Sequence, residues 1–535
     1  MIQQSKIQIL LLLWAIAGTA NLAAQNRDKA WKDFRFVKNS EAGLTGYNAA
    51  GLKALPVGQL SVAEISATKD NGGFVNYYQS GNAISYGAQT ESFYRLSPGV
   101  VFYGKIDYNH FAGKNMSGSA FIDPYGNPFD IVEYEEHPGE KKLETCNLTG
   151  AVSADVYNGL TLGGKVDYTA ANYAKEKDLR HKNKLLDIAA TAGLSYPITP
   201  AVEAGANYYY RRSVEGVEFG SYGTTDRQFY SLIAYGAFYG TAEPFGNVGY
   251  TKDNEEKPMV SDYHGASIQL NIRISPALVW HNEVTGKVRN GYYGKKAPYT
   301  IVYADHDGHL WEYNGTLSLR NGKNLHQLKV TADREDLKNY ERIYRTEQQP
   351  NGSNKVVYYG SLKTTNRRVQ HLNAEYTANL GIEDFNPAWT LKAALNHSGR
   401  EQYASVYPYY RRQDIRATTL NLSAARNIVK NKAMYTLHAG ATYGSGGGTP
   451  QADQTYVEPA AAQSAPASAE RYLNQEYEYL TADRFAGEAT LKYSRIFDAN
   501  IKGHISVNYM FTAASDVAYI GSTHHRLRLA IGCTF

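Results

Sequence analysis

Apolar and polar residues alternate along many stretches of about ten residues in this chain, a period of two that is typical of β-strands. In the segment VVFYGKIDYN at 100–109, Phe102 and Ile106 lie on one face, whereas Lys105 and Asp107 lie on the other. The last residues, HHRLRLAIGCTF, repeat this pattern up to the C-terminus. The alternation predicts an all-β protein with one apolar and one polar face to each strand.

The connections between these stretches alternate in length. Short ones, such as SPG at 97–99 and YNG at 157–159, have the Pro, Gly and Asn of tight turns. Long polar ones lie near 109–142, 212–263, 290–308, 336–368 and 444–484. Short turns at one end and long loops at the other are typical of an outer-membrane barrel with periplasmic turns and extracellular loops.

The pattern predicts a single large transmembrane antiparallel up-and-down β-barrel of about eighteen strands, with sixteen as the next choice. The segment QFYSLIAYGAFYG at 228–240 is either a hairpin outside the membrane or two further strands. The predicted strands are 58–68, 82–95, 100–109, 143–155, 160–170, 185–196, 201–211, 264–274, 279–289, 309–320, 325–335, 369–380, 389–398, 413–425, 433–443, 485–496, 501–511 and 524–535.

Composition fits a water-filled barrel, because 48 Gly and 45 Tyr accompany a negative mean hydropathy of −0.47. A formal charge of +4 with interspersed signs gives no field that would favour nucleic acid. Two cysteines exclude a disulfide scaffold. No catalytic motif is recognisable, so we predict neither an enzyme nor a cofactor, and the short cluster Asp305–His309 reads as a solvated loop rather than a metal site.

The N-terminus predicts export. Lys6 precedes an apolar run from Ile7 to Gly18 that is too short to span a bilayer, and a small-residue site follows at 22–24. We therefore expect a signal peptide at 1–24, a periplasmic lead-in or short hatch at 25–57 and the barrel at 58–535.

The C-terminal strand resembles the signal by which the barrel-assembly machinery recognises Gram-negative outer-membrane proteins. The matching positions are Leu527, Leu529, Ile531 and the terminal Phe535. The mature chain is similar in style to large outer-membrane barrels of Bacteroidota without an established activity. This resemblance implies the outer membrane as location, with its lipid, lipopolysaccharide and assembly machinery as partners, and leaves a surface lipoprotein partner open.

A shorter resemblance concerns the N-terminal segment. Asn48-Ala49-Ala50-Gly51-Leu52 is similar to the Asn-Pro-Ala-Gly-Leu hatch motif of the long-chain fatty-acid transporter family, with Ala49 in place of the proline. This resemblance implies a hatch and uptake of a hydrophobic substrate. A plain lead-in that folds under the barrel is the alternative.

Charged residues at inward positions are expected to line the lumen, because charges on the lipid face are costly. They either pair across strands to hold the wall or form a ring that selects ions. The candidates are Lys105, Asp107, Lys165, Asp167, Arg273, Glu283, Lys287, Glu375, Lys392 and Lys492.

Two aromatic and basic clusters fall where strands are expected to reach the outer rim. Tyrosines there would form the interfacial girdle, and arginines would bind lipopolysaccharide phosphates or an anionic ligand. The residues are Tyr209, Tyr210, Arg211, Arg212, Tyr409, Tyr410, Arg411 and Arg412.

The sequence thus predicts a channel or transporter for small solutes or nutrients. The alternative is a surface-exposed binding barrel whose lumen stays closed and whose long loops hold a partner or glycan.

Overall fold

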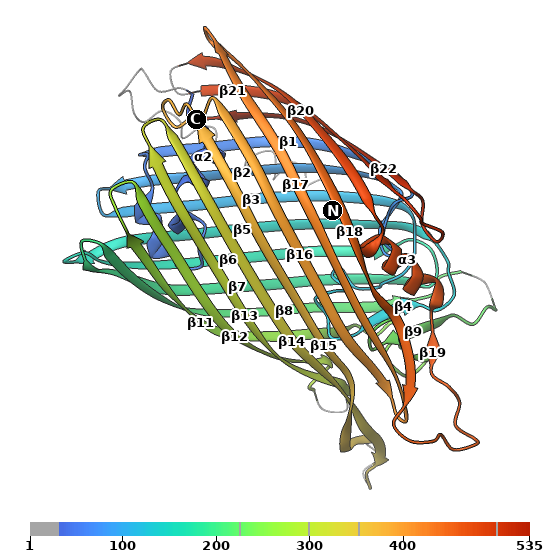
Figure 1. Ribbon diagram of the computed structural model, residues 1–535. Helices are drawn as coiled ribbons and strands as arrows, with labels where there is room; N and C mark the ends of the chain where they lie inside the picture. The colour runs from blue at the N-terminus through green and yellow to red at the C-terminus, as the bar shows by residue number, and fades with distance from the viewer. Residues whose placement is uncertain (1–30, 224–225, 298–299, 351, 353, 499–500) are drawn as a thin grey trace.

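Eighteen strands form one closed antiparallel barrel in a computed structural model of the chain (Figure 1). Each strand pairs with the next barrel strand along the chain, and the first pairs with the last to close the ring. The predicted fold class and the count of eighteen are confirmed. The structure describes residues 31–535 except 224–225, 298–299, 351, 353 and 499–500, so the expected signal peptide lies outside the described residues.

The elements have the following bounds. The barrel strands are β1 (Gln59–Gly72), β2 (Asn82–Ser97), β3 (Val100–Met116), β5 (Gly139–Tyr157), β6 (Leu160–Lys175), β7 (Arg180–Thr199), β8 (Val202–Gly220), β11 (Lys257–Arg273), β12 (Leu278–Gly294), β13 (Val302–Asn321), β14 (Asn324–Gln348), β15 (Asn354–Leu380), β16 (Trp389–Val406), β17 (Tyr409–Lys430), β18 (Ala433–Thr455), β20 (Arg484–Asp498), β21 (Ile501–Ala514) and β22 (Thr523–Thr534). A separate small sheet has β4 (Asp130–Glu133), β9 (Tyr230–Ala234), β10 (Tyr239–Pro244) and β19 (Ala467–Ser468). The helical elements are α2 (Phe34–Ser40), η1 (Ala42–Leu44), η2 (Ala49–Ala54) and α3 (Glu470–Thr481).

The strands are longer than predicted at the long-loop end. β14 and β15 have 25 and 27 residues, and their hairpin projects beyond the rest of the barrel (Figure 1). The predicted loop at 444–484 is also shorter, because β18 continues to Thr455 and α3 begins at Glu470. The cluster Asp305–His309 lies within β13 rather than in a loop.

The outward face of the barrel is apolar. Ile268 is 66% exposed and Leu529 is 48% exposed, and every barrel strand carries at least one exposed large apolar side chain. Such a belt is stable against hydrocarbon, and a closed barrel satisfies all of its backbone hydrogen bonds within the wall. Among the described residues, none of the helices is long and apolar enough to cross a bilayer.

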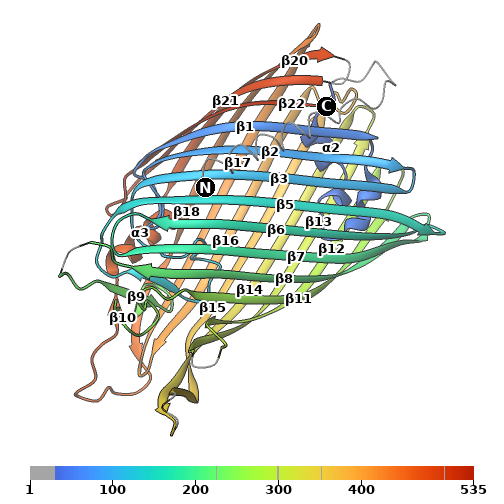
Figure 2. The ribbon, with the colours of Figure 1, turned by 180° about the vertical axis from the view of Figure 1, so that it is seen from behind.

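The N-terminal segment (residues 34–57) lies inside the barrel at the end with short turns, near the C-terminus in both views (Figures 1 and 2). Asp33 caps α2, since its side chain accepts a hydrogen bond from the Phe36 amide. Phe34 and Leu52 are buried with Phe93 and Val101 of the wall in one apolar cluster. The segment is therefore packed into the lumen rather than hanging below the barrel.

At the opposite end, three long connections fold inward. They supply β4, β9, β10, β19 and α3, which we call the loop layer. The segment 228–240, for which a hairpin and two more barrel strands were both possible, is the β9–β10 hairpin of the small sheet. The lumen is consequently occupied by the chain at both ends.

Candidate functional site in the barrel lumen

Asn48 fastens the N-terminal segment to the wall. Its Nδ2 donates to the Leu194 carbonyl at 2.9 Å and to Gln269 Oε1 at 3.0 Å. Its Oδ1 accepts from the Ala50 amide at 3.0 Å and so caps η2. One buried side chain thus both shapes the short helix and ties it to the wall strands β7 and β11.

Wall glycines make room for this contact. A Cβ on Gly163 would lie 2.0 Å from the Ala50 nitrogen, and one on Gly193 would lie 2.4 Å from Asn48 Oδ1. By contrast, a Cβ on Gly164, the next residue and on the outward face, would meet nothing within 4 Å. The close approach of segment and wall therefore requires glycine at the inward positions.

Tyr47 anchors the other side of the segment through charge. Lys287 Nζ lies 4.2 Å from the centre of the Tyr47 ring, donates to Tyr47 Oη at 3.0 Å and pairs with Glu312 at 2.7 Å. Tyr209 packs edge-on against Tyr47. Burial, with Glu312 nearby, raises the pKa of Tyr47, so the phenol stays protonated and available as a donor. A cavity of about 170 Å³ remains between the segment and the wall, lined in part by Glu41, Glu203 and His281.

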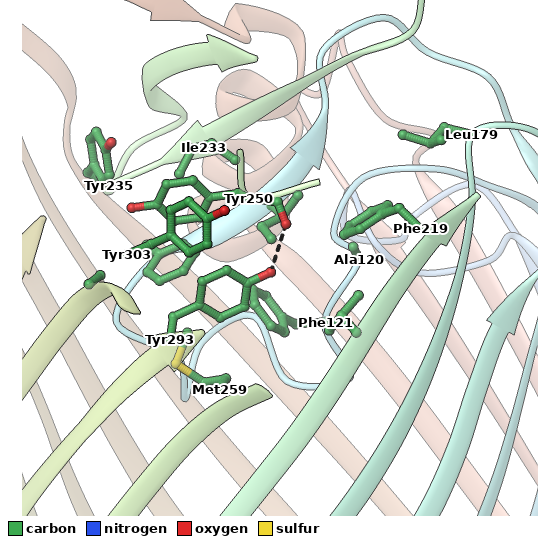
Figure 3. Close-up of a cluster of buried hydrophobic side chains, with 14 of the residues drawn as sticks. Ala120, Phe121, Leu179, Phe219, Ile233, Tyr235, Tyr250, Met259, Tyr293 and Tyr303 are labelled. Carbon is green, nitrogen blue, oxygen red and sulfur yellow. Dashed lines mark hydrogen bonds between the residues drawn. The ribbon is translucent and has the colours of Figure 1, made fainter. Parts of the chain in front are cut away.

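The loop layer seals the other end with an aromatic cluster (Figure 3). Tyr293 stacks on Tyr250 with 5.4 Å between ring centres and donates to the Tyr250 carbonyl at 3.1 Å. Phe129 meets both rings edge-on. These side chains come from two inserted loops and from β12, so the cluster joins the layer to the wall.

Inward arginines of β16 and β17 hold the same layer. Arg400 makes a two-pronged ion pair with Glu476 of α3, at 2.5 and 3.0 Å. Arg411 is 2% exposed and pairs with Asp453 and Glu470. It also donates to the Ala237 carbonyl and to Ser468. Charge-assisted bonds of this kind fix position as well as adding stability.

A chamber of about 450 Å³ opens under α3 and the 73–81 loop, and we call it the apolar chamber. Its polar edge has Arg526, whose Nε donates to Asp70 at 2.7 Å, and His524, 3.0 Å from the same oxygen. Arg484 also lines it and donates only to carbonyls at the end of α3 among the described residues. The remaining lining is mainly apolar and includes Phe74, Phe111, Met116, Leu143, Leu480 and Met510.

Several predicted lumen residues pair with neighbours on the inner face. Lys165 pairs with Asp167 at 3.0 Å, and Lys392 with Glu375 at 2.9 Å. Glu283 accepts a hydrogen bond from Gln269 at 2.7 Å. The other placements follow. Lys287 contacts Tyr47 and Glu312, and Asp107 accepts a hydrogen bond from Asn147. Within the described residues, Lys105, Arg273 and Lys492 make no side-chain hydrogen bond or ion pair.

The two predicted rim clusters are divided between the faces, because successive residues of a strand point in opposite directions. Four of the eight side chains point into the barrel and contact other parts of the chain there, namely Tyr209, Arg211, Tyr409 and Arg411. Arg211 binds both oxygens of Asp187. Arg212 pairs with Asp262, Arg412 with Glu401, and Tyr410 stacks on Tyr456, all on the outside. The fourth outward residue is Tyr210, beside His264. A contact with lipopolysaccharide stays a prediction.

The sequence reading missed Asn48 as a wall contact and Arg400 and Arg484 as luminal groups. Arg400 lies at an inward position just beyond the predicted end of its strand, so strand parity could have indicated it. The inserted loops have a weaker signal in the sequence, because apolar residues such as Phe121, Ile131 and Ile233 lie within the long connections predicted at 109–142 and 212–263. Within the described residues, no group of His, Cys, Asp and Glu is arranged to hold a metal.

Comparisons with known proteins give weak likenesses among solved structures and one family. The structure aligns with the outer membrane transporter YddB from Escherichia coli over 89% of this chain and 81% of that one, at 7% identity and a TM-score of 0.39. The alignment with the ferric preacinetobactin receptor BauA from Acinetobacter baumannii covers 89% of this chain and 80% of that one, at 9% identity and a TM-score of 0.36. The alignment with a mutant of the monoaromatic hydrocarbon channel TodX covers 91% of this chain and 92% of that one, at 11% identity and a TM-score of 0.32.

The search of curated proteins found no match. A family model described as a family of unknown function (DUF6850) matches residues 49–535, which includes the whole barrel and part of the N-terminal segment. The chain belongs to this family.

Proposed function

We propose that the chain is an outer-membrane transport barrel for an amphipathic solute with a negatively charged head. The apolar chamber is the single observation that carries this proposal. It combines a volume of about 450 Å³ with a mainly apolar lining that includes two guanidinium groups, those of Arg484 and Arg526. Binding sites for small molecules typically have this composition, with a few polar groups that orient an otherwise apolar ligand.

Charge supports an anion rather than a cation. The chamber lining includes two guanidinium groups, Arg484 and Arg526, and one carboxylate, Asp70, which already accepts from Arg526 and His524. The lining therefore carries a net positive charge, and a carboxylate or phosphate head can bind guanidinium donors with two bonds. The apolar body of the solute would lie against Phe111, Leu143 and their neighbours.

The transport step requires that both ends of the lumen open. The N-terminal segment closes one end through Asn48 and Tyr47, and the loop layer closes the other. We infer that the segment is a hatch, because it is a short stretch of chain inside the lumen that is joined to the barrel by one covalent connection, at β1. Its release would require the contacts of Asn48 and Tyr47 to exchange with water and the apolar cluster around Phe34 and Leu52 to separate.

Binding to the apolar chamber is tested with the full barrel in lipid nanodiscs. The probes are 4-phenylbutyrate and its uncharged amide, measured by calorimetry. We expect the acid to bind at least about tenfold more tightly, a difference of about 1.4 kcal/mol. Arg484→Gln with Arg526→Gln should remove that preference. Arg528→Gln is the matched control, because Arg528 is also inward on β22 but pairs with Glu64 outside the chamber. Equal affinity for acid and amide would refute the proposed anionic head.

The second candidate is a binding barrel with a closed lumen. It is favoured by the aromatic cluster that joins the loop layer to the wall, which has 17 buried residues. Planar-bilayer recording separates the two functions. Transport predicts that 4-phenylbutyrate changes the frequency of opening events, whereas a folded barrel that stays electrically silent with and without the solute supports the binding barrel.

A further inference from the structure

A small cavity of about 50 Å³ lies where the loop layer meets the inner wall, separate from the apolar chamber. Its wall side is formed by Thr365 and Arg367 of β15 and by Arg400 and Gln402 of β16. Its other side is formed by the β3–β5 connection around Asn127 and by the turn at 235–238. Because a single water needs only about 10–15 Å³ by this measure, the cavity can hold a compact ion.

Arg367 has unused hydrogen-bonding capacity in this cavity. The residue is 7% exposed, and its only hydrogen bond among the described residues runs from Nη1 to the Asn127 carbonyl at 2.9 Å. Its Nε and Nη2 are buried and have no hydrogen-bond partner, and the same holds for Arg400 Nε. Buried donors of a charged group are normally satisfied, so these three nitrogens indicate a missing acceptor.

Three guanidinium groups share two carboxylates as ion-pair partners at this cavity. Arg367 lies near Arg289 and Arg400. Glu476 forms the ion pair with Arg400. Glu335 accepts a hydrogen bond from Arg289 at 2.9 Å and lies 3.8 Å from Arg367 Nη2. The remaining carboxyl of the cavity, Asp130, accepts from Ser119 at 2.5 Å and from Tyr77 at 3.0 Å.

Arg367 is therefore a buried cation whose hydrogen bond goes to a neutral carbonyl and whose ion-pair partner, Glu335, is 3.8 Å away and shared with Arg289. Arg367 pairs with Gln402 in the ladder, and Arg400 pairs with Val369. The two arginines are consequently diagonal neighbours on one face, close enough to act on one ion.

We propose that this cavity binds a compact monovalent anion of the size of chloride, held by Arg367 Nε and Nη2 with Arg400 Nε. The anion completes the contact between the β3–β5 connection and strands β15 and β16. It thereby fastens the loop layer over the lumen, and halide concentration sets how firmly this end is closed. The inference does not depend on which solute the barrel transports.

The test uses the full barrel in detergent micelles at pH 7.5. Hydrogen exchange of residues 117–136 is compared in potassium bromide and in potassium gluconate at equal ionic strength, since gluconate is too large for the cavity. We expect exchange about fivefold slower once bromide reaches about four times its dissociation constant. Crystals soaked in bromide should show anomalous density within hydrogen-bond distance of Arg367.

Arg367→Gln should abolish the difference between the two salts. Arg211→Gln is the control, because Arg211 is inward and already bound to both oxygens of Asp187, and that variant should keep the difference. If Arg367→Gln fails to fold, the bromide crystal of the unaltered chain decides. Equal exchange in both salts, or density for water alone beside Arg367, overturns the proposal. Bromide density without any change in exchange identifies an adventitious ion and also overturns it.

Discussion

Asn48 shows how a single side chain can determine whether a lumen is closed. Its amide group gives and accepts hydrogen bonds at once, to Leu194, Gln269 and Ala50. A buried group of this kind is costly to remove, because its former partners are left unsatisfied. Gly193 faces Asn48 and Gly163 faces Ala50, and both contribute by having no side chain.

Asn48→Ala should weaken the docking of the N-terminal segment by about 1–3 kcal/mol. The expected result is faster proteolytic cleavage within residues 34–57 while the barrel remains folded. Limited proteolysis with mass spectrometry measures this. Asn39→Ala is the control, because Asn39 is exposed and contributes only its carbonyl, to Gln327. Equal cleavage rates for the two variants would contradict the role given to Asn48.

Gly163→Ala should displace the segment in the same way, since its Cβ would overlap the Ala50 nitrogen. Overpacking of this kind costs about 1–3 kcal/mol. Gly164→Ala, one residue away on the outward face, should behave as the unaltered protein. Leu52→Cys added to each variant reports the accessibility of the segment by cysteine labelling, because Leu52 is 3% exposed. Labelling that is as slow in Gly163→Ala as in Gly164→Ala would show that the contact is not tight.

Individual strands could be predicted from the sequence because lipid and water impose a strict period of two. For the same reason Leu527, Leu529 and Ile531 were placed correctly on the outward side of β22. The contacts of Asn48 and Arg367 could not be predicted. They join residues 146 and 240 positions apart, to Leu194 and Asn127 respectively, and depend on how the chain folds back into the barrel.

Among the elements, β4 lies within the long polar connection predicted at 109–142, yet in the structure it is part of the loop layer inside the barrel. Its first residue, Asp130, is buried and is held by Ser119 and Tyr77, with Lys141 of the wall nearby. Burial raises the pKa of Asp130 to about 6, and these hydrogen bonds oppose the rise. Acidic residues at 133–136 follow Asp130 in the long connection predicted at 109–142, and little in the sequence indicates this burial because the apolar stretch is too short to have a period.

The docking of β4 should depend on pH. A carboxyl whose pKa is higher in the folded state binds its proton more tightly there, so docking is strongest at low pH and weakens as pH rises from about 4 to about 6. The full effect of a shift of about two units is about 3 kcal/mol. Hydrogen exchange of residues 128–134 should be slower at pH 5 than at pH 7.5, after correction for intrinsic rates.

Asp130→Asn should make this docking nearly independent of pH, because the amide does not titrate. Asp123→Asn is the control, since Asp123 is exposed and accepts only from backbone amides of its own turn. A pH effect that persists in Asp130→Asn would assign the dependence to other groups.

For the molecule as a whole, the sheet closes where β1 meets β22, with Val62 opposite Thr534 and Gly72 opposite His524. The seam is held by ordinary ladder bonds along its length, and the Phe535 amide and carbonyl both bond to Ser61. The outward residues of β22 belong to the apolar belt, and the inward ones, Arg526 and Arg528, pair with β1. The last strand therefore contributes to the belt, the lumen and the closure.

Leu529→Arg should lower the free energy of unfolding in lipid bilayers by about 2–4 kcal/mol, because the charge would face hydrocarbon. Leu529→Phe preserves an apolar surface and should change stability little. Urea unfolding in vesicles, followed by tryptophan fluorescence, measures both. A loss of the same size in both variants would mean that position 529 is sensitive to shape rather than to charge.

The pairing of the first strand with the last also constrains the order of assembly. Residues 34–57 precede β1, yet they end up enclosed by a ring that only residues 523–534 complete. We expect the N-terminal segment of the exported chain to dock on the inner face of a curved, open sheet before β1 pairs with β22. If the edges joined first, those residues would have to be threaded in from below. Docking of the N-terminal segment before ring closure avoids this threading step.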